Sequence, residues 1–329
     1  MYSAIQPTGC LHIGNYFGAI TRWLQLHHDP GYQSIFSVAD LHAITLPWKP
    51  DEMRESIRRS VATIVACGID PDKCTFFQQS EVPHHCNLAW ILSCLVTLPK
   101  LQGLPQFREK SVLTKSASPG LLLYPVLQAA DILLYKAEHV PVGADQLQQI
   151  NLCQHLVQKF NGQFGKTFAE PRALLSAVDG AERIKSLREP SKKMSKSDAD
   201  ARSKINVLDP DDEIARKITK AVTDSTSHVS FDPDKRPGVS NLVLMHSLFT
   251  GNSVDQVVAQ SVSLDTGQFK KVVAEAAIQH LRPIRTRALQ ILQEPLYIES
   301  ILSQGREKAM AIAEPNIKEI MTRVGFKSG

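Results

Sequence analysis

The chain has 329 residues, of which 43% are hydrophobic and 21% charged, a composition typical of a globular protein with one large or two medium domains. Its net charge of +4 comes entirely from residues 1–205, which carry 22 Lys and Arg against 18 Asp and Glu, whereas residues 206–329 carry 15 of each. The longest apolar stretch is interrupted by Pro125, Gln128 and Asp131, which excludes a membrane-spanning helix.

Short apolar runs alternate with amphipathic stretches through the first half of the chain. Residues 1–5, 34–40 and 75–80 are predicted strands. A helical pattern follows each of them, and the second of these helices is opened by Pro50 and closed by Gly68. The alternation predicts a Rossmann-like, doubly wound parallel α/β sheet with helices on both faces. Such sheets bind ligands at the carboxyl ends of their strands.

Strand signals disappear beyond about Asp209, where apolar residues recur at helical spacing. The clearest stripe consists of Phe269, Val272, Val273, Ala276, Ala277 and Leu281. We therefore expect an α/β domain over residues 1–205, with an insertion at about 99–125, and an all-helical domain over 206–329. Residues 183–204, at the junction, contain eight basic and three acidic residues, a local positive charge that favours an anionic partner.

The cysteines form no C-x-x-C pair and have no histidine at zinc-finger spacing. They are Cys10, Cys67, Cys74, Cys86, Cys94 and Cys153. We expect reduced, buried thiols and no structural metal. The N-terminus shows neither a signal peptide nor an arginine-rich presequence, so any targeting segment is expected to have been removed or never to have existed.

The stretch "QPTGCLHIGNY", residues 6–16, joins the first predicted strand to the helix after it. Gly14 and Asn15 would lie at the helix N-terminus, where unpaired backbone N–H groups favour an anion. A glycine there lets a base or a phosphate approach the backbone, and His12 and Asn15 can donate hydrogen bonds to phosphate. The structural alternative is a turn at Thr8 with Asn15 merely capping the helix.

The stretch "KKMSKSD", residues 192–198, contains three lysines and two serines. As a linker it would be a solvated run of charge. Phosphoryl and nucleotidyl transfer, however, needs mobile cations that meet charge developing in the transition state, and Lys193 and Lys196 on a flexible loop fit that need. Met194 would anchor such a loop on an apolar surface.

Together, H-I-G-N near the start and K-M-S-K-S at 193–197 resemble the two signatures of class I aminoacyl-tRNA synthetases in form, order and approximate separation. The resemblance implies that the first domain is the catalytic domain of that class and that the lysine-rich stretch is a phosphate loop.

Further stretches resemble the tryptophanyl-tRNA synthetase family in particular, and the resemblance runs almost end to end. They are "DLHAIT" (40–45), "QFREK" (106–110), "GLLLYPVLQAADILLY" (120–135), "VPVGADQ" (140–146), "AVTDS" (221–225) and "PGVSNL" (237–242). The H-I-G-N form and Gln128 look more like the mitochondrial branch than the bacterial one.

The resemblance implies roles for individual residues. His12, Lys110, Lys193 and Lys196 would be catalytic, the lysines acting on phosphate. ATP would be bound by Gln6, Pro7, Thr8, Gly14, Asn15, Gly143, Ala144, Asp145, Ile184, Lys193, Met194, Ser195, Lys196 and Ser197. Tryptophan would be bound by Tyr2, Gln6, His42, Tyr124, Gln128, Asp131, Ile132, Val140, Val142 and Gln146, with Asp131 accepting the indole N–H and Tyr124, Gln146 and Gln6 holding the polar end.

The chemistry of Asp131 agrees with this role. A tryptophan pocket must satisfy one buried donor, and a carboxylate in an apolar segment is costly without a partner. The alternatives are a helix N-cap or a pair with a nearby lysine such as Lys136. Two departures from the family pattern matter. Ala144 stands where the family usually has glutamate, and Gln128 stands where bacterial relatives commonly have methionine.

The implied reaction has two steps, namely attack of the tryptophan carboxylate on the α-phosphorus of Mg²⁺–ATP and transfer of the tryptophanyl group to tRNA(Trp). Mg²⁺ would arrive with ATP, with no metal site of the protein's own. The helical domain, with its C-terminal helix, would read the anticodon in a homodimer. We expect a mitochondrial matrix enzyme, or alternatively one of bacterial-type cytoplasm. Competing interpretations are a tyrosyl-tRNA synthetase, a nucleotidylyltransferase and a catalytically silent relative that only binds tRNA or a protein partner.

Overall fold

Three parallel strands form the centre of the first half of the chain. The computed structural model describes residues 1–105, 107–108, 117–143, 146–175, 184–196, 198 and 200–326. The strands are β1 (Tyr2–Ile5), β2 (Ile35–Val38) and β3 (Thr75–Gln78), in the order β1-β2-β3. Tyr2 is in register with Ile35, and Ile35 with Thr75, so the carboxyl ends of all three strands meet at one edge. The three predicted strands are confirmed.

A second parallel pair, which the sequence did not predict, extends this layer. It consists of β4 (His139–Val142) and β5 (Arg172–Leu175). The Ser3 hydroxyl on β1 donates a hydrogen bond to the carbonyl of Pro141 on β4 at 3.3 Å, so β4 lies beside β1. Proline is rare within strands because it cannot donate to the ladder, and Pro141 therefore masks β4 in the sequence.

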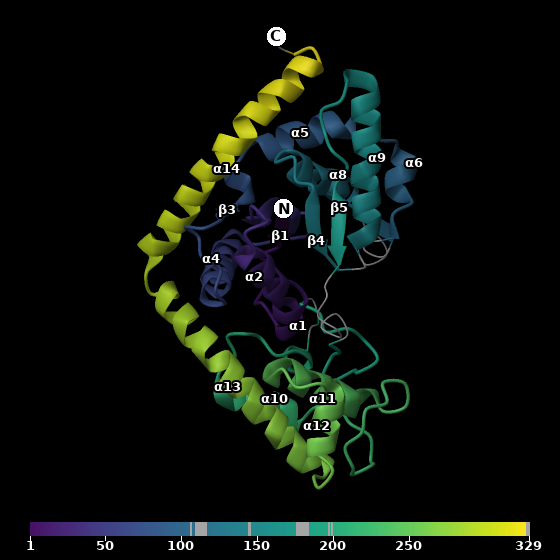
Figure 1. The fold of residues 1–329 in the computed structure, drawn as a ribbon, viewed down its shortest axis with the longest axis vertical. Coiled ribbons are helices and arrows are strands. Elements are labelled where there is room, and N and C mark those ends of the chain that lie inside the picture. Colours follow the sequence, from purple (N-terminus) through teal and green to yellow (C-terminus); the bar gives the residue numbers. More distant parts are fainter. Residues whose placement is uncertain are drawn as a thin grey trace.

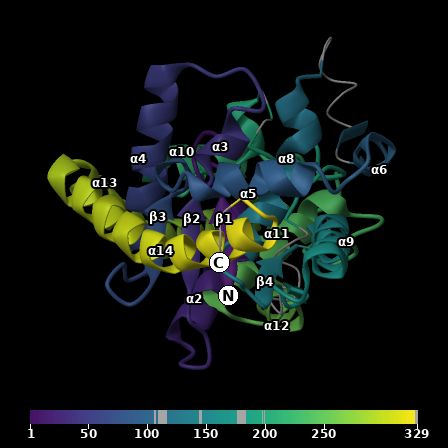
Figure 2. The same ribbon diagram turned by 90° about the horizontal axis from the view of Figure 1, so that it is seen from above.

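Helices cover both faces of the sheet, as the alternation predicts (Figures 1 and 2). Ile5, Phe36 and Phe76 point into one core, shared with the helices that follow β1 and β2. Ile35 and Phe77 point into the other. The elements of this half are α1 (Ile13–Asn15), the π-helical turn η1 (Tyr16–Ile20), α2 (Thr21–His28), α3 (Asp40–Ala43), α4 (Pro50–Ala66), the 3₁₀ turn η2 (Gln79–Glu81), α5 (His84–Ser93), α6 (Leu98–Gln102), α8 (Pro119–Leu133) and α9 (Leu147–Phe164).

Beyond Asp209 the described residues form helices and the loops between them. They follow the short turn η5 (Ala201–Ser203) and are α10 (Asp211–Thr219), α11 (Pro237–Thr250), α12 (Val254–Gln260), α13 (Thr266–Leu292) and α14 (Pro295–Arg323). Phe269, Val273 and Leu281 of the predicted stripe are fully buried, but Val272 is 40% exposed, so the buried face of α13 is narrower than expected.

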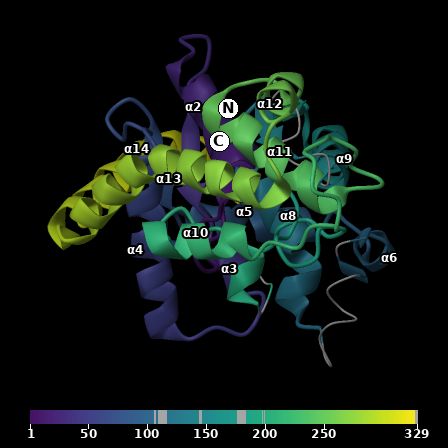
Figure 3. The same cartoon turned by 90° about the horizontal axis from the view of Figure 1, so that it is seen from below.

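The two longest helices connect the lower and upper parts of the molecule. In Figure 1, α13 and α14 follow one another along one side, and in the view of Figure 3 α13 runs beside α10 and α11, with which it is in contact. α13 packs against α4 and α10, and α14 packs against β3. At that contact, Gly305 of α14 faces the backbone of Phe76 so closely that a Cβ atom would collide with the Phe76 carbonyl oxygen.

All six cysteines lie within the described ranges and are free thiols. The expectation that they are buried is confirmed for Cys74 and Cys153, but Cys10 and Cys67 are only partly buried and Cys86 and Cys94 are exposed. Both are on or next to α5, whose outer face also carries Trp90 at 69% exposure. Within the described part of the chain, no helix combines the length and the hydrophobicity that a membrane crossing requires.

Candidate active site

A cavity of about 320 Å³ lies between β1, β4, α8 and the helical segment after β1. All ten residues predicted to bind the amino acid line it, namely Tyr2, Gln6, His42, Tyr124, Gln128, Asp131, Ile132, Val140, Val142 and Gln146. They come from segments far apart in the sequence, which the parallel sheet brings together. The cavity combines aromatic and aliphatic walls with a few polar groups, the usual character of a small-molecule site.

Asp131 supplies the buried charge of this cavity and is 1% exposed. Neither sequence-based alternative for it holds, because Asp131 lies in the last turn of α8 and Lys136 pairs with Glu319 instead. One carboxylate oxygen accepts a hydrogen bond from His42 Nε2 at 2.7 Å. The other accepts from the Gln79 amide at 2.7 Å and from His85 Nδ1 at 2.6 Å.

These partners keep the carboxylate ionised. Burial alone would raise the pKa of Asp131, but the nearby His85 and His42 outweigh that effect and hold the pKa below its usual value. Gln79 and His85 are both fully buried and are absent from the cavity lining, so they act on Asp131 from behind. Neither residue was recognisable from the sequence, because their spacing from Asp131 has no local pattern.

The opposite wall contains residues that the sequence analysis missed. Gly18, Ala19, Arg22 and Trp23 line the cavity from η1 and α2. The indole N–H of Trp23 donates to the Ser3 hydroxyl at 2.9 Å. A signal was available, because Gly14, Gly18 and Arg22 recur every four residues and therefore share one face of the helical segment.

The first signature begins the helical segment after β1. His12 is 3% exposed, and its Nδ1 finds no hydrogen-bond partner among the described residues. Burial, and then the charges of Lys196, Lys204 and Lys193, lower the pKa of His12 to about 3. The imidazole is therefore neutral at physiological pH. Asn15 does have the capping role considered above, since its side-chain oxygen accepts the His12 backbone N–H at 3.3 Å.

The second signature folds back onto the first. The Met194 backbone N–H donates to the Ile184 carbonyl at 3.0 Å, and the Met194 side chain is 3% exposed in the main core, as predicted for an anchor. The Lys196 ammonium donates to the Gln6 carbonyl at the end of β1, at 3.0 Å. Burial lowers the pKa of Lys196 to about 8. The two signatures thus meet beyond the carboxyl end of β1, the edge where such sheets bind ligands.

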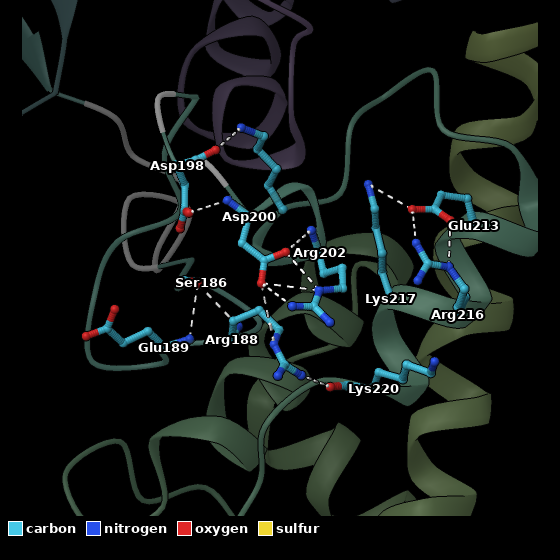
Figure 4. A network of polar contacts seen from close by, with 11 residues as sticks. Ser186, Arg188, Glu189, Asp198, Asp200, Arg202, Glu213, Arg216, Lys217 and Lys220 are labelled. Carbon is cyan, nitrogen blue, oxygen red and sulfur yellow. Dashed lines mark hydrogen bonds and ion pairs between the residues drawn. The ribbon is translucent and has the colours of Figure 1, made fainter.

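A polar network holds this loop from below (Figure 4). The Lys204 ammonium donates to the carbonyls of Lys196 and Asp198, at 2.6 and 3.0 Å. Asp200 accepts two N–H groups of Arg202, and Arg188 donates to the Lys220 carbonyl at the end of α10 at 2.9 Å. The described residues of this stretch are therefore held by hydrogen bonds, as a free linker would not be.

The remaining predicted nucleotide-binding residues differ in their exposure. Gly143 lines the cavity, Pro7 and Ile184 are buried, and Thr8, Lys193 and Ser195 are exposed. Lys110, Ala144, Asp145 and Ser197 lie outside the described residues. In the described ranges, no group of three or more His, Cys, Asp and Glu side chains is arranged to hold a metal ion.

Comparison with known proteins places these features in a family. The family model described as "tRNA synthetases class I (W and Y)" matches residues 1–282. The tryptophan–tRNA ligase of the bacterium Caldanaerobacter subterraneus is 44% identical over 326 residues, which cover 99% of this chain and 98% of that protein.

Solved structures agree along the whole chain. The tryptophanyl-tRNA synthetase of Mycoplasma pneumoniae superposes with a TM-score of 0.90 at 29% identity, covering 99% of this chain and 97% of that one. The enzyme from Campylobacter jejuni, solved with ADP and tryptophan, gives a TM-score of 0.85 at 29% identity, covering 98% and 99%. These relatives are bacterial, so the expected likeness to the mitochondrial branch gains no support from them.

Proposed function

Because this chain belongs to the class I tRNA synthetases for tryptophan and tyrosine, we infer that it is a tryptophan–tRNA ligase, which activates L-tryptophan with ATP and transfers it to tRNA(Trp). Relatives that carry this name match it at 41–44% identity over nearly its full length. The tyrosyl-tRNA synthetase of Aeropyrum pernix, at 21% identity, shares only the fold.

The observation that carries the assignment to this chain's own residues is the buried carboxylate of Asp131 in an apolar cavity of about 320 Å³. Its ion pair with His42 and its contacts with Gln79 and His85 account for three hydrogen bonds. A carboxylate can accept about four. The remaining acceptor position suits a ligand with one N–H donor, and the indole ring is such a ligand.

Activation would proceed by alignment and electrostatics. The tryptophan carboxylate attacks the α-phosphorus of ATP, the bond to pyrophosphate breaks, and tryptophanyl-adenylate forms. Lys193, Lys196 and neutral His12 are placed beyond the end of β1, where they would meet the charge of the leaving pyrophosphate. A ribose hydroxyl of tRNA then attacks the acyl carbon and releases AMP. No covalent enzyme intermediate is required.

Mg²⁺ would enter as part of the ATP substrate, since phosphate oxygens and water supply most of its preferred octahedral ligands. The helical part, α10 to α13, would read the anticodon. As the relatives are bacterial, we favour the bacterial-type cytoplasm over the mitochondrial matrix.

We further propose a homodimer. Large apolar side chains are exposed on α5, at the start of α6 and on the segment after α3, and a second copy of the chain would cover them. They are Ile44, Leu46, Trp48, Trp90 and Leu98. With tRNA bound across both copies, the near-neutral charge of residues 206–329 would be less of an obstacle to tRNA binding.

ATP–pyrophosphate exchange on the purified chain tests the function. Exchange is expected with tryptophan and not with tyrosine or without amino acid. Exchange that prefers tyrosine would replace the assignment with the tyrosyl one. No exchange with either amino acid would favour a silent tRNA-binding relative, with Ala144 as the first residue to revert to glutamate.

A further inference from the structure

We propose that His85, with Tyr135 behind it, is a positioning residue that selects the indole N–H by fixing the orientation of Asp131. The inference rests on the proposed function and deepens it. It concerns two residues that do not line the cavity.

The two carboxylate oxygens of Asp131 differ in their hydrogen-bond partners. Oδ1 accepts from both Gln79 and His85, so its two acceptor positions are filled. Among the described residues, Oδ2 accepts only from His42 and keeps one position open. Asp131 lines the cavity and its Oδ1 partners do not, whereas His42, the partner of Oδ2, also lines it. The open position is therefore on the oxygen bound to His42.

Both ring nitrogens of His85 are within hydrogen-bonding distance of a neighbouring side chain. A carboxylate can only accept, so His85 Nδ1 must carry the hydrogen in its 2.6 Å contact with Asp131. The other ring nitrogen, Nε2, lies 2.9 Å from the Tyr135 hydroxyl. Each end of the ring is therefore fixed by a buried group, since His85 is fully buried and Tyr135 is 6% exposed.

Tyr135 connects this chain of contacts back to the cavity wall. Its ring stacks on Tyr2, with centroids 5.6 Å apart and planes 11° apart. Tyr2 lines the cavity. The same phenol thus supports a wall against which the indole ring would lie and the histidine that orients its acceptor. The distance between the Tyr2 ring and the Asp131 carboxylate would then be fixed, and an amino-acid ring of one size would fit best between them.

Removal of the His85 donor would leave a carboxylate oxygen buried with one partner fewer. The carboxylate can then rotate or take up a proton, and either change removes the acceptor from the indole N–H. A purely structural histidine would instead weaken binding of any ligand of this shape.

The test uses two amino acids of nearly the same shape, tryptophan and β-(3-benzothienyl)alanine, in which sulfur replaces the indole N–H. Pyrophosphate exchange gives kcat/KM for each, and their ratio measures recognition of the N–H. His85→Leu is expected to lower the ratio about tenfold or more, the value of a hydrogen bond to a charged group. His85→Asn is smaller but keeps an N–H near the position of Nδ1, and it is expected to recover most of the ratio.

The matched control is the neighbouring histidine. His84 pairs with Glu314 of α14 at 2.6 Å and not with Asp131, and His84→Leu is expected to leave the ratio unchanged. If His85→Leu does not fold, Tyr135→Phe provides the second test, because it keeps the ring stacked on Tyr2 and removes only the hydroxyl. It should lower the ratio in the same direction and by less.

The outcomes separate the inference from its premise. An unchanged ratio in both His85→Leu and Tyr135→Phe, or equal losses for both amino acids, overturns the positioning role. A wild-type ratio that Asp131→Ala leaves intact overturns the acceptor assignment and the inference with it. Absence of tryptophan-dependent exchange in the wild type overturns the proposed function itself.

Discussion

Lys196 combines a functional position with an unfavourable environment. Its ammonium is bound to the Gln6 carbonyl, and burial lowers its pKa from 10.5 to about 8. The free enzyme therefore loses this charge as the pH rises through about 8. The expected result is a fall in kcat/KM for ATP above that pH, measured by pyrophosphate exchange.

The variant Lys196→Arg separates this titration from others, because arginine stays charged and should move the alkaline limb to higher pH. Thermal melting provides a second control. Between about pH 8 and 10.5 the unfolded chain binds the proton more tightly than the folded one, so this group makes the folded state more stable as pH rises. A loss of activity that parallels a loss of stability would contradict the role of Lys196.

We expect Gly14 to be required for ATP binding, for a reason that is visible only in the structure. The sequence suggested that a missing Cβ lets nucleotide reach the backbone. A Cβ at this position would first meet the His12 ring, 2.8 Å from Cε1 and 2.9 Å from Nδ1. Gly14→Ala should therefore displace His12 and raise KM for ATP at least several-fold. Gly162→Ala, with open space at its Cβ position, is the control, and an unchanged KM in Gly14→Ala would refute the displacement.

Among single residues, those that line the cavity were predicted from the sequence far better than those that hydrogen-bond to them from outside the cavity. Asp131 was identifiable because a carboxylate between Ala130 and Ile132 is unusual. His85 and Gln79 look ordinary, because nothing in a single sequence says that a histidine on another helix will face that carboxylate. Such partners are set by the tertiary fold alone.

Among the contacts between helices and strands, that of α14 with β3 depends on one glycine, Gly305. An alanine in the middle of a helix is normally more stabilising than a glycine, by about 1 kcal/mol. At Gly305 the sign should reverse, because the new Cβ collides with the Phe76 carbonyl and the helix must shift.

We expect Gly305→Ala to lower the free energy of unfolding by about 1–3 kcal/mol, measured by urea denaturation. Gln304→Ala changes the adjacent exposed residue and should leave that free energy nearly unchanged. A Gly305→Ala protein as stable as the wild type would show that the helix and strand can separate without cost.

Helices and strands with a clear hydrophobic pattern were predicted from the sequence. Those that form only because of the elements packed beside them were not. The strands of residues 2–5, 35–38 and 75–78 are apolar runs bounded by turn residues, and α4 has a proline at its start and a glycine at its end. The β4–β5 pair contains Pro141 and polar ends, so only pairing reveals it. The π-helical turn η1 has no signature in its composition either, although it places Gly18 on the cavity wall.

The exposed apolar residues of α5 and its surroundings lead to a prediction about assembly. If a second copy covers them, Trp90→Glu should convert a dimer to a monomer in light scattering, because a charge would be buried without a partner. Leu296→Glu changes a residue on α14 that is 78% exposed and should leave the mass unchanged. A Trp90→Glu protein that remains dimeric at micromolar concentration would place the interface elsewhere.

The position of α14 also bears on how the protein is made. β3 is built from residues 75–78 at the edge of the three-stranded sheet, whereas the helix that packs against this edge strand spans residues 295–323. During synthesis the ribosome delivers β3 long before this helix, so the strand waits with its edge uncovered while the residues between them are translated. The central sheet can complete its packing only after residues 295–323 have been synthesised. A pause in translation between β3 and α14 would therefore prolong the period in which the nascent chain depends on chaperones.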